Sequence, residues 1–296
     1  MYKLKHWINI ENINWDLLSE NPNAIHLLEK NPDKINWEYL SGNPNAIHLL
    51  EKNQDKITWA WLSSNPNAIH LLEKNPDKIN WAWLSSNPNA IHLLEKNLDK
   101  IYWDNLSRNP NAIHLLEKNQ DKIDWFWLSY NPNAIHLLEK NLHKLNEEEL
   151  ACLSENKNAM PLLEKNPDKI DWDRLSENSN AIHLLEKNQE KIDWYSILVN
   201  PNAIPLLEKN LDKWLDNECD ILSGNPNAIP LLEKHQDKIL WGWFSKNPSI
   251  FELDYYALKE RCDIYKEELM QIALHPSRIK KLLDMGISID ELDSCI

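Results

Sequence analysis

The apolar residues of this chain repeat a short pattern that is typical of a helix with one buried face. Ala24, Ile25 and the Leu27–Leu28 pair fill one arc of a helical wheel drawn at about 100° per residue, and polar residues fill the opposite arc. Asn23, just before this segment, is of a type favoured at helix N-caps, and Asn31 ends it. The pattern predicts a first helix over residues 24–30, capped by Asn23.

A second, shorter helix is predicted a few residues later. Asn36 is a good N-cap type, and a helix over residues 37–42 places Trp37 and Leu40 on one side and positions 38, 39 and 42 on the other. We expect Trp37 and Leu40 in the core. Helices this short are unstable alone, so each pair must pack against neighbouring pairs.

This two-helix unit is copied along almost the whole chain. The motif Asn-Pro-Asn-Ala-Ile, intact or altered, begins at Asn21, Asn43, Asn65, Asn87, Asn109, Asn131, Asn156, Asn178, Asn200, Asn225 and Asn247. Eight spacings are 22 residues, and the two before Asn156 and Asn225 are 25 residues. We predict an all-α fold, an α-solenoid of about eleven 22-residue units of two short helices each. The two longer units are expected to bend it.

The two ends of the chain differ from the repeat and define three regions. Residues 1–20 form a degenerate N-terminal unit, because residues 13–19 match residues 35–41. Residues 21–248 form the solenoid, and residues 249–296 form a C-terminal cap with helices near 252–274 and 276–285. Terminal units of such arrays are expected to be atypical, because their outer faces meet water.

A leucine-rich repeat of the same length is the alternative fold. Residues 40–43, Leu-Ser-Gly-Asn, match part of the leucine-rich pattern. Its central leucine would fall at position 38, where the units have residues such as Glu38, Ala60 and Asp104. This mismatch favours the helical solenoid.

The chain also resembles a known group of proteins. Its units read Asn-Pro-Asn-Ala-Ile-His-Leu-Leu-Glu-Lys-Asn and Asp-Lys-Ile-Asn-Trp, and residues 273–279 read Ala-Leu-His-Pro-Ser-Arg-Ile. Over nearly its whole length the chain is similar to uncharacterised tandem-repeat proteins of giant nucleocytoplasmic DNA viruses. The resemblance implies a viral origin and a host-cell setting, and it assigns no activity to particular residues.

Composition argues against several classes of function. The formal net charge is −14, from 46 acidic and 32 basic residues that are mixed along the chain, whereas nucleic-acid binding needs a basic surface. No stretch approaches the roughly 18 apolar residues of a membrane span. We expect a soluble intracellular protein, in the host-cell cytoplasm if it is viral, with neither nucleic acid nor membrane as its partner.

The sequence contains no arrangement typical of catalysis or cofactor binding. His26 and Glu29 have a spacing that can ligate a metal, but equivalent histidines would lie roughly 9 Å apart in stacked units, too far to share one ion. The four cysteines share no repeat position. In three units the histidine is replaced by proline, at Pro161, Pro205 and Pro230. We therefore expect no metal, no cofactor and no enzyme activity, with the histidines at the surface.

Positions 39 and 42 are the variable columns of the repeat. Constant columns build a scaffold, while variable ones are free to specialise, and aromatic and arginine side chains are common in protein recognition. The expected partner-binding residues are Tyr39, Trp61, Trp83, Trp127, Arg108 and Tyr130. Drift on an unconstrained surface is the alternative explanation of this variation.

These observations predict a non-enzymatic repeat scaffold. It would bind another protein, of unknown identity, through the variable face of the second helix of each unit. The alternative is a purely structural role, as a spacer or as an array that associates with copies of itself.

Overall fold

The computed structural model describes residues 1–215, 220–273 and 275–285. In this part of the chain the repeats are helical and the two strands lie at the ends, which confirms the all-α solenoid and leaves no place for a leucine-rich repeat. The chain divides into two compact parts. We call Leu4–Phe251 the repeat domain, and Met1–Lys3 with Glu252–Ile296 the terminal unit.

Each repeat contains two short helices joined by one turn of 3₁₀-helix. The first helices are α2 (Ile25–Lys30), α4 (Ile47–Lys52), α6 (Ile69–Lys74), α8 (Ile91–Glu95), α10 (Ile113–Lys118), α12 (Ile135–Lys140), α14 (Met160–Lys165), α16 (Ile182–Lys187), α17 (Ile204–Lys209) and α19 (Ile229–Lys234). The second helices are α1 (Trp15–Leu18), α3 (Trp37–Gly42), α5 (Trp59–Ser64), α7 (Trp81–Ser86), α9 (Trp103–Arg108), α11 (Trp125–Ser129), α13 (Glu147–Glu155), α15 (Trp172–Glu177), η10 (Ser196–Val199), η11 (Asp220–Gly224) and α20 (Trp241–Lys246).

The connecting turns were not predicted from the sequence. They are η1 (Ile10–Asn12), η2 (Pro32–Lys34), η3 (Gln54–Lys56), η4 (Pro76–Lys78), η5 (Leu98–Lys100), η6 (Gln120–Lys122), η7 (Leu142–Lys144), η8 (Pro167–Lys169), η9 (Gln189–Lys191) and η12 (Gln236–Lys238), with α18 (Leu211–Trp214) at the equivalent place in one unit. Seven of these turns, η2 to η7 and η9, place a lysine over the tryptophan ring of the preceding unit, as with Lys56 Nζ, 4.5 Å from the Trp37 ring centroid. Trp37 is therefore half-buried, with one side on the core and the other beneath a cation.

The expected cap of the second helix is confirmed and that of the first is wrong. The Asn36 side chain accepts hydrogen bonds from the backbone N–H groups of Glu38 and Tyr39, at 3.1 and 3.3 Å. Helix α2 instead follows Ala24, which has no side chain to cap it. Asn23 donates to a carbonyl of another unit, that of Pro248, at 3.0 Å. Its role is to join units.

The core of each unit lies between its first and second helices. Ala24, Leu28 and Leu40 are fully buried, as are their equivalents in the other complete units. Glu29 and Lys30 are exposed on the opposite side of the first helix, as its polar arc predicts.

A buried row of asparagines connects the units. Asn43 Nδ2 donates to the carbonyl oxygens of Ser19 and Asn21, at 3.0 and 2.9 Å, and its Oδ1 accepts from the Asn45 N–H at 3.0 Å. All eleven asparagines that begin the repeat motif make the equivalent pair of donor bonds, at 2.8–3.1 Å. We call this row the asparagine ladder; its side chains are at most 3% exposed.

The two longer units do not interrupt the ladder, and the bend expected at these units stays a prediction. Asn156 keeps its two carbonyl partners at 2.8 and 3.0 Å, and Asn225 does the same at 2.8 and 3.0 Å. In the first of these units the extra residues lengthen α13 at its start. There Asn146 and Glu149 form a reciprocal capping box. The C-terminal part of α13, which carries the contacts, stays in register.

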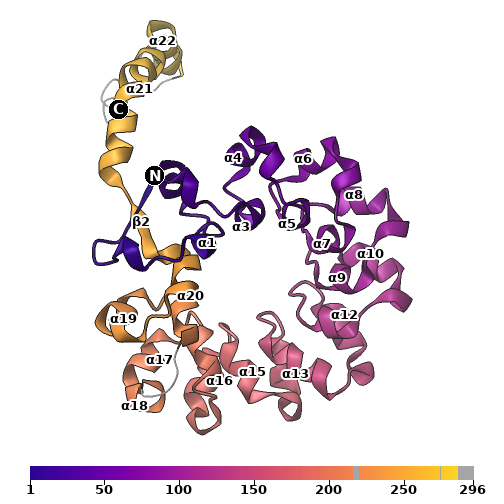
Figure 1. The fold of residues 1–296 in the computed structure, drawn as a ribbon. Helices are drawn as coiled ribbons and strands as arrows, with labels where there is room; N and C mark the ends of the chain where they lie inside the picture. Colours follow the sequence, from indigo (N-terminus) through magenta and orange to yellow (C-terminus); the bar gives the residue numbers. More distant parts are fainter. Residues whose placement is uncertain (216–219, 274, 286–296) are drawn as a thin grey trace. The chain divides into compact units, whose positions relative to one another are not determined.

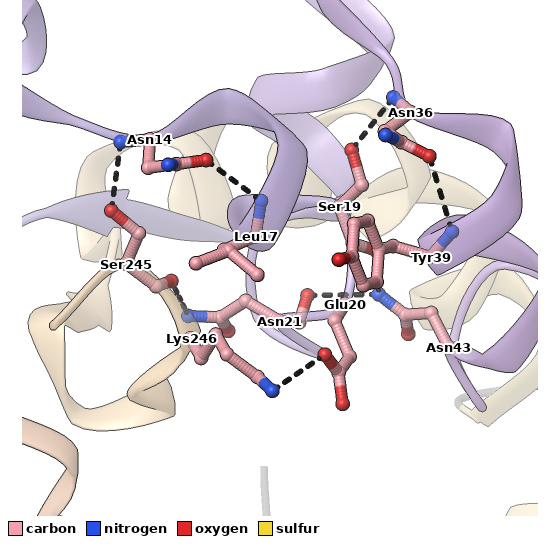
Figure 2. A network of polar contacts seen from close by, with 10 residues as sticks. All are labelled: Asn14, Leu17, Ser19, Glu20, Asn21, Asn36, Tyr39, Asn43, Ser245 and Lys246. Carbon is pink, nitrogen blue, oxygen red and sulfur yellow. Dashed lines mark hydrogen bonds and ion pairs between the residues drawn. The ribbon is translucent and has the colours of Figure 1, made fainter. Parts of the chain in front are cut away.

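The ladder closes on itself between the first and last units. Asn21 Nδ2 donates to the carbonyl oxygens of Ser245 and Asn247, both at 2.9 Å, and the Asn14 N–H donates to Ser245 Oγ at 2.9 Å (Figure 2). Lys246 Nζ lies 2.8 Å from a carboxylate oxygen of Glu20. The repeat domain is thus a closed ring. Its second helices lie on the inside and its first helices on the outside (Figure 1).

Both ends of the repeat domain build the eleventh unit. The segment η13 (Pro248–Ile250) takes the place of a first helix, and η1 and α1 supply the turn and the second helix. The Lys5 N–H donates to the Ile250 carbonyl at 3.0 Å and joins the two pieces. The expectation that the terminal faces meet water is therefore wrong, because these faces meet each other.

The terminal unit contains two longer helices. Strand β1 (Tyr2–Leu4) pairs with β2 (Phe251–Leu253), and α21 (Tyr255–Ala273) and α22 (Pro276–Asp284) follow. The position next to α20 that a C-terminal cap would cover is occupied by α1, so the ladder has no open end there. Among the described residues, no helix has the length and apolar character needed to cross a membrane.

Candidate interaction face

The side of the second helices that carries positions 39 and 42 is turned away from the core. Because the core lies between the two layers of helices, this side faces the inside of the ring (Figure 1). We call it the inner face. Position 39 is Leu17, Tyr39, Trp61, Trp83, Asn105, Trp127, Cys152, Arg174, Ser196, Ile221 and Trp243, and position 42 is Glu20, Gly42, Ser64, Ser86, Arg108, Tyr130, Glu155, Glu177, Val199, Gly224 and Lys246.

Three of the predicted partner-binding residues meet in one aromatic arc. The ring centroids of Tyr39 and Trp61 are 5.5 Å apart, and those of Trp61 and Trp83 are 5.6 Å apart. Trp61 Nε1 donates to a carboxylate oxygen of Glu38 at 3.0 Å. Trp83, at the end of the arc, is 43% exposed. Stacking of adjacent units thus produces the apolar patch that the sequence predicts.

The other three predicted residues form a separate group beyond Asn105. The Arg108 guanidinium lies 5.4 Å from the Trp127 ring centroid, and the Trp127 and Tyr130 rings are 6.0 Å apart. Arg108 is exposed, and the two aromatic side chains are partly buried. The six predicted residues therefore form two groups on one face.

Side chains at position 42 fit those at position 39 of the next unit. A Cβ on Gly42 would lie 3.2 Å from Trp61 Cε3, closer than nine in ten real Cβ contacts. Likewise, a Cβ on Gly224 would lie 3.6 Å from Cε3 of Trp243 in the next unit. A tryptophan at position 39 in these units follows a residue without a side chain.

Two further pairs match in size or charge. The large Tyr130 precedes the small Cys152, and Glu155 precedes Arg174, whose Nη1 lies 3.7 Å from its carboxylate. In these pairs the side chains at the two columns complement each other across neighbouring units.

A polar cluster lies beside the second aromatic group. Arg174 Nη1 donates to the Tyr130 hydroxyl at 2.6 Å, and Cys152 is buried next to them. Sequence reasoning missed Cys152 and Glu155, because the 25-residue unit lacks the usual tryptophan. Counting back from Asn156 instead of forward from Asn131 puts both residues in the variable columns.

Burial controls the ionisation of this cluster. Burial, together with the hydrogen bond to Cys152, raises the pKa of Tyr130 to about 12. Burial also raises the pKa of the Cys152 thiol and that of the Glu155 carboxyl, against the opposing effect of Arg174. The phenol and the thiol are consequently neutral at pH 7, and a neutral thiol is a poor nucleophile.

Glu177 provides a test of these electrostatics. Burial, and after it repulsion from Glu155, raises the pKa of the Glu177 carboxyl. The folded protein therefore binds this proton more tightly than the unfolded chain does, and it loses stability as the pH rises through the raised pKa. Glu177→Gln removes that loss. Urea unfolding should show a stabler variant at pH 8, and the gain should vanish at pH 4. Glu11→Gln, at an exposed site, should change nothing; a gain for Glu177→Gln that is equal at both pH values would contradict this assignment.

An apolar cavity of 260 Å³ opens on the inner face between η10, η11 and α20. It exists because position 39 is Ile221 in that unit and position 42 is Gly224, both smaller than the aromatic residues of the arc. Trp243 forms one wall and is 50% exposed. The lining residues are Val199, Ile221, Gly224, Trp243, Lys246, Asn247 and Pro248. Nothing in the repeat pattern had pointed to it.

Six histidines of the first helices pair with a glutamate of the preceding unit on the outside of the ring. His48 Nε2 lies 2.9 Å from Glu29 Oε1 of the preceding unit, and His70 lies at the same distance from Glu51. These side chains are 40–47% exposed. In the part of the chain that the structure describes, no three or more His, Cys, Asp or Glu residues are grouped so that they could hold a metal ion.

The chain matches no family model, no curated protein and no solved structure. The likeness to viral repeat proteins accordingly remains a resemblance in motif. Function has to be inferred from the inner face and its chemistry.

Proposed function

We propose that the repeat domain is a non-enzymatic ring scaffold that binds a segment of another protein on its inner face. The observation that carries this proposal is the aromatic arc of Tyr39, Trp61 and Trp83. The constant columns are occupied by the core and by the asparagine ladder, whereas Trp83 leaves 43% of its surface in solvent. Exposed tryptophans that gather in a patch are typical of binding sites, where they act as anchors.

The charges around the arc favour a basic partner segment. Glu38 and Asp104, both exposed at position 38, flank the arc, and the chain as a whole has a net charge of −14. A lysine or arginine side chain placed over a tryptophan gains a cation–π attraction in addition to the pull of nearby carboxylates. Lys56 already makes such a contact with Trp37 within the ring, at 4.5 Å.

The cavity beside Trp243 supports a second anchoring point. Its 260 Å³ is smaller than the roughly 300–1,000 Å³ of sites for small molecules. It suits one apolar side chain of the bound segment better than a cofactor. If the viral resemblance holds, the partner is a protein of the host-cell cytoplasm.

Two double variants separate binding from folding. Trp61→Ala with Trp83→Ala removes the arc and should abolish partner capture. Trp59→Ala with Trp81→Ala removes side chains that pack on the core and should cost more stability. Affinity purification with mass spectrometry, beside a thermal melt of each variant, measures both effects. An equal loss of stability in the two pairs, or capture unaffected by loss of the arc, would refute the proposal.

A further inference from the structure

Helix α21 of the terminal unit exposes a long apolar side. It spans 19 residues, Tyr255–Ala273. Tyr255 is 74% exposed, Tyr265 is 50% exposed and Ile272 is 57% exposed. Large exposed apolar surfaces mark contact sites. Helix α21 therefore has the properties of one side of a protein–protein interface.

The spacing of its apolar residues identifies the kind of partner. Tyr255, Leu258, Cys262, Tyr265 and Ile272 are separated by three, four, three and seven residues, which places them at the a, d, a, d and d positions of a heptad repeat. These residues form an apolar seam along one side of the helix, and Tyr256 and Met270, 73% and 42% exposed, widen it on one flank. Apolar residues at a and d spacing typically pack against a second helix. The seam therefore calls for another helix of similar length.

We infer that α21 pairs in an antiparallel manner with α21 of a second copy of this chain, forming a homodimer. Symmetry about the midpoint between residues 263 and 264 places Tyr255 opposite Ile272 of the second copy, and Cys262 opposite Tyr265. The contact is self-complementary, as a two-fold interface must be. It does not involve the inner face, so it goes beyond the proposed function and stands independently of it.

Charges beside the seam support this direction. Arg261 and Glu268, both exposed, lie on the same flank of the seam. In the antiparallel pair Arg261 of each copy lies near Glu268 of the other, so the interface contains two such pairs. Lys259 meets Lys266 on the other side, where long exposed lysines can turn toward water.

A parallel pair is less favourable. It would place Arg261 against Lys266 of the second copy. Its only attractive pair would use Asp254, whose carboxylate already accepts the Ala257 N–H at the start of α21, at 3.2 Å.

Sedimentation of the full chain over a concentration series tests the dimer. The wild-type protein should show a monomer–dimer equilibrium, and Tyr265→Glu should make it monomeric, because a carboxylate would be buried in the seam. Ile264→Glu is the matched control: Ile264 is apolar and 74% exposed, but lies off the seam, so dimerisation should persist. A monomeric wild type, a dimer unaffected by Tyr265→Glu, or equal loss in both variants would overturn the inference.

Charge reversal tests the direction of the pair. Arg261→Glu should weaken the dimer by about tenfold, since two attractive pairs become repulsive. Adding Glu268→Arg restores opposite charges and should recover the wild-type affinity. A parallel dimer would instead be strengthened by Arg261→Glu, which removes its repulsion with Lys266, and that result would refute the antiparallel arrangement.

Discussion

Replacing Asn109 by alanine is expected to lower the free energy of unfolding of the repeat domain by about 2 to 4 kcal/mol. Asn109 Nδ2 donates to the carbonyl oxygens of Ser85 and Asn87, at 3.0 and 2.9 Å, and Asn109 itself is 1% exposed. Its Oδ1 also accepts the Asn111 N–H at 3.0 Å. The variant loses all three bonds where water cannot replace them. Urea unfolding followed by tryptophan fluorescence measures the effect.

The same motif supplies the control. Asn111 Nδ2 donates to the Pro88 carbonyl at 2.9 Å, but this bond is exposed. Because water can satisfy that carbonyl, Asn111→Ala should cost about 1 kcal/mol or less. Similar losses for the two variants would mean that burial of the ladder contributes little.

Asn21→Ala is expected to destabilise the domain about as much as Asn109→Ala does. In a closed ring Asn21 has the same two carbonyl partners as every other ladder residue, here those of Ser245 and Asn247 at 2.9 Å. In an open solenoid it would be a terminal residue with nothing to donate to, and its replacement would be almost neutral. Urea unfolding of Asn21→Ala and Asn109→Ala under the same conditions therefore tests whether the ring is closed.

A near-zero effect of Asn21→Ala would show that the ring is open. Asn23→Ala provides the reference at the closing contact. Asn23 Nδ2 donates to the Pro248 carbonyl at 3.0 Å in a partly buried position, and its loss should cost less than that of Asn21.

Helix α3 was predictable to the residue because its determinants are local. Asn36 caps α3 through its own neighbours, and Trp37 and Leu40 point the same way within one turn and a half. The first helix was displaced by one residue, because the asparagines before it are used between units. In the sequence of a single repeat Asn23 looks like a helix cap. Its hydrogen bond to a carbonyl of another unit becomes visible only once the units are stacked.

Closure was not predicted, although the sequence contained a sign of it. Each unit is rotated by a small angle relative to the one before it. Whether eleven such rotations add up to a full circle depends on their total, which the sequence of one unit does not reveal. In a terminal unit whose outer face met water, the serine and asparagine of the ladder contacts would not need to be retained. Yet Ser19 and Asn21 at one end, and Ser245 and Asn247 at the other, are all kept and nearly inaccessible to solvent.

The candidate site was predicted in part for a similar reason. Tyr39, Trp61 and Trp83 come from consecutive units of equal length, so stacking alone brings them together. The cluster at Cys152 depends on where three inserted residues are absorbed, which the repeat pattern leaves open. The cavity beside Trp243 depends on the volumes of several small neighbours from three units.

The closed ladder also bears on how copies of this protein meet. A linear array of these units would end in an asparagine carboxamide without acceptors and, at the far side, in two carbonyls without a donor. Those ends are complementary, so molecules would add head to tail without limit, as heterologous contacts do when they fail to close. Here Asn21 and the carbonyls of Ser245 and Asn247 satisfy one another within one chain. Closure of the ring therefore leaves no unpaired ladder donor or acceptor through which a further molecule could add, so the ladder cannot build a fibre.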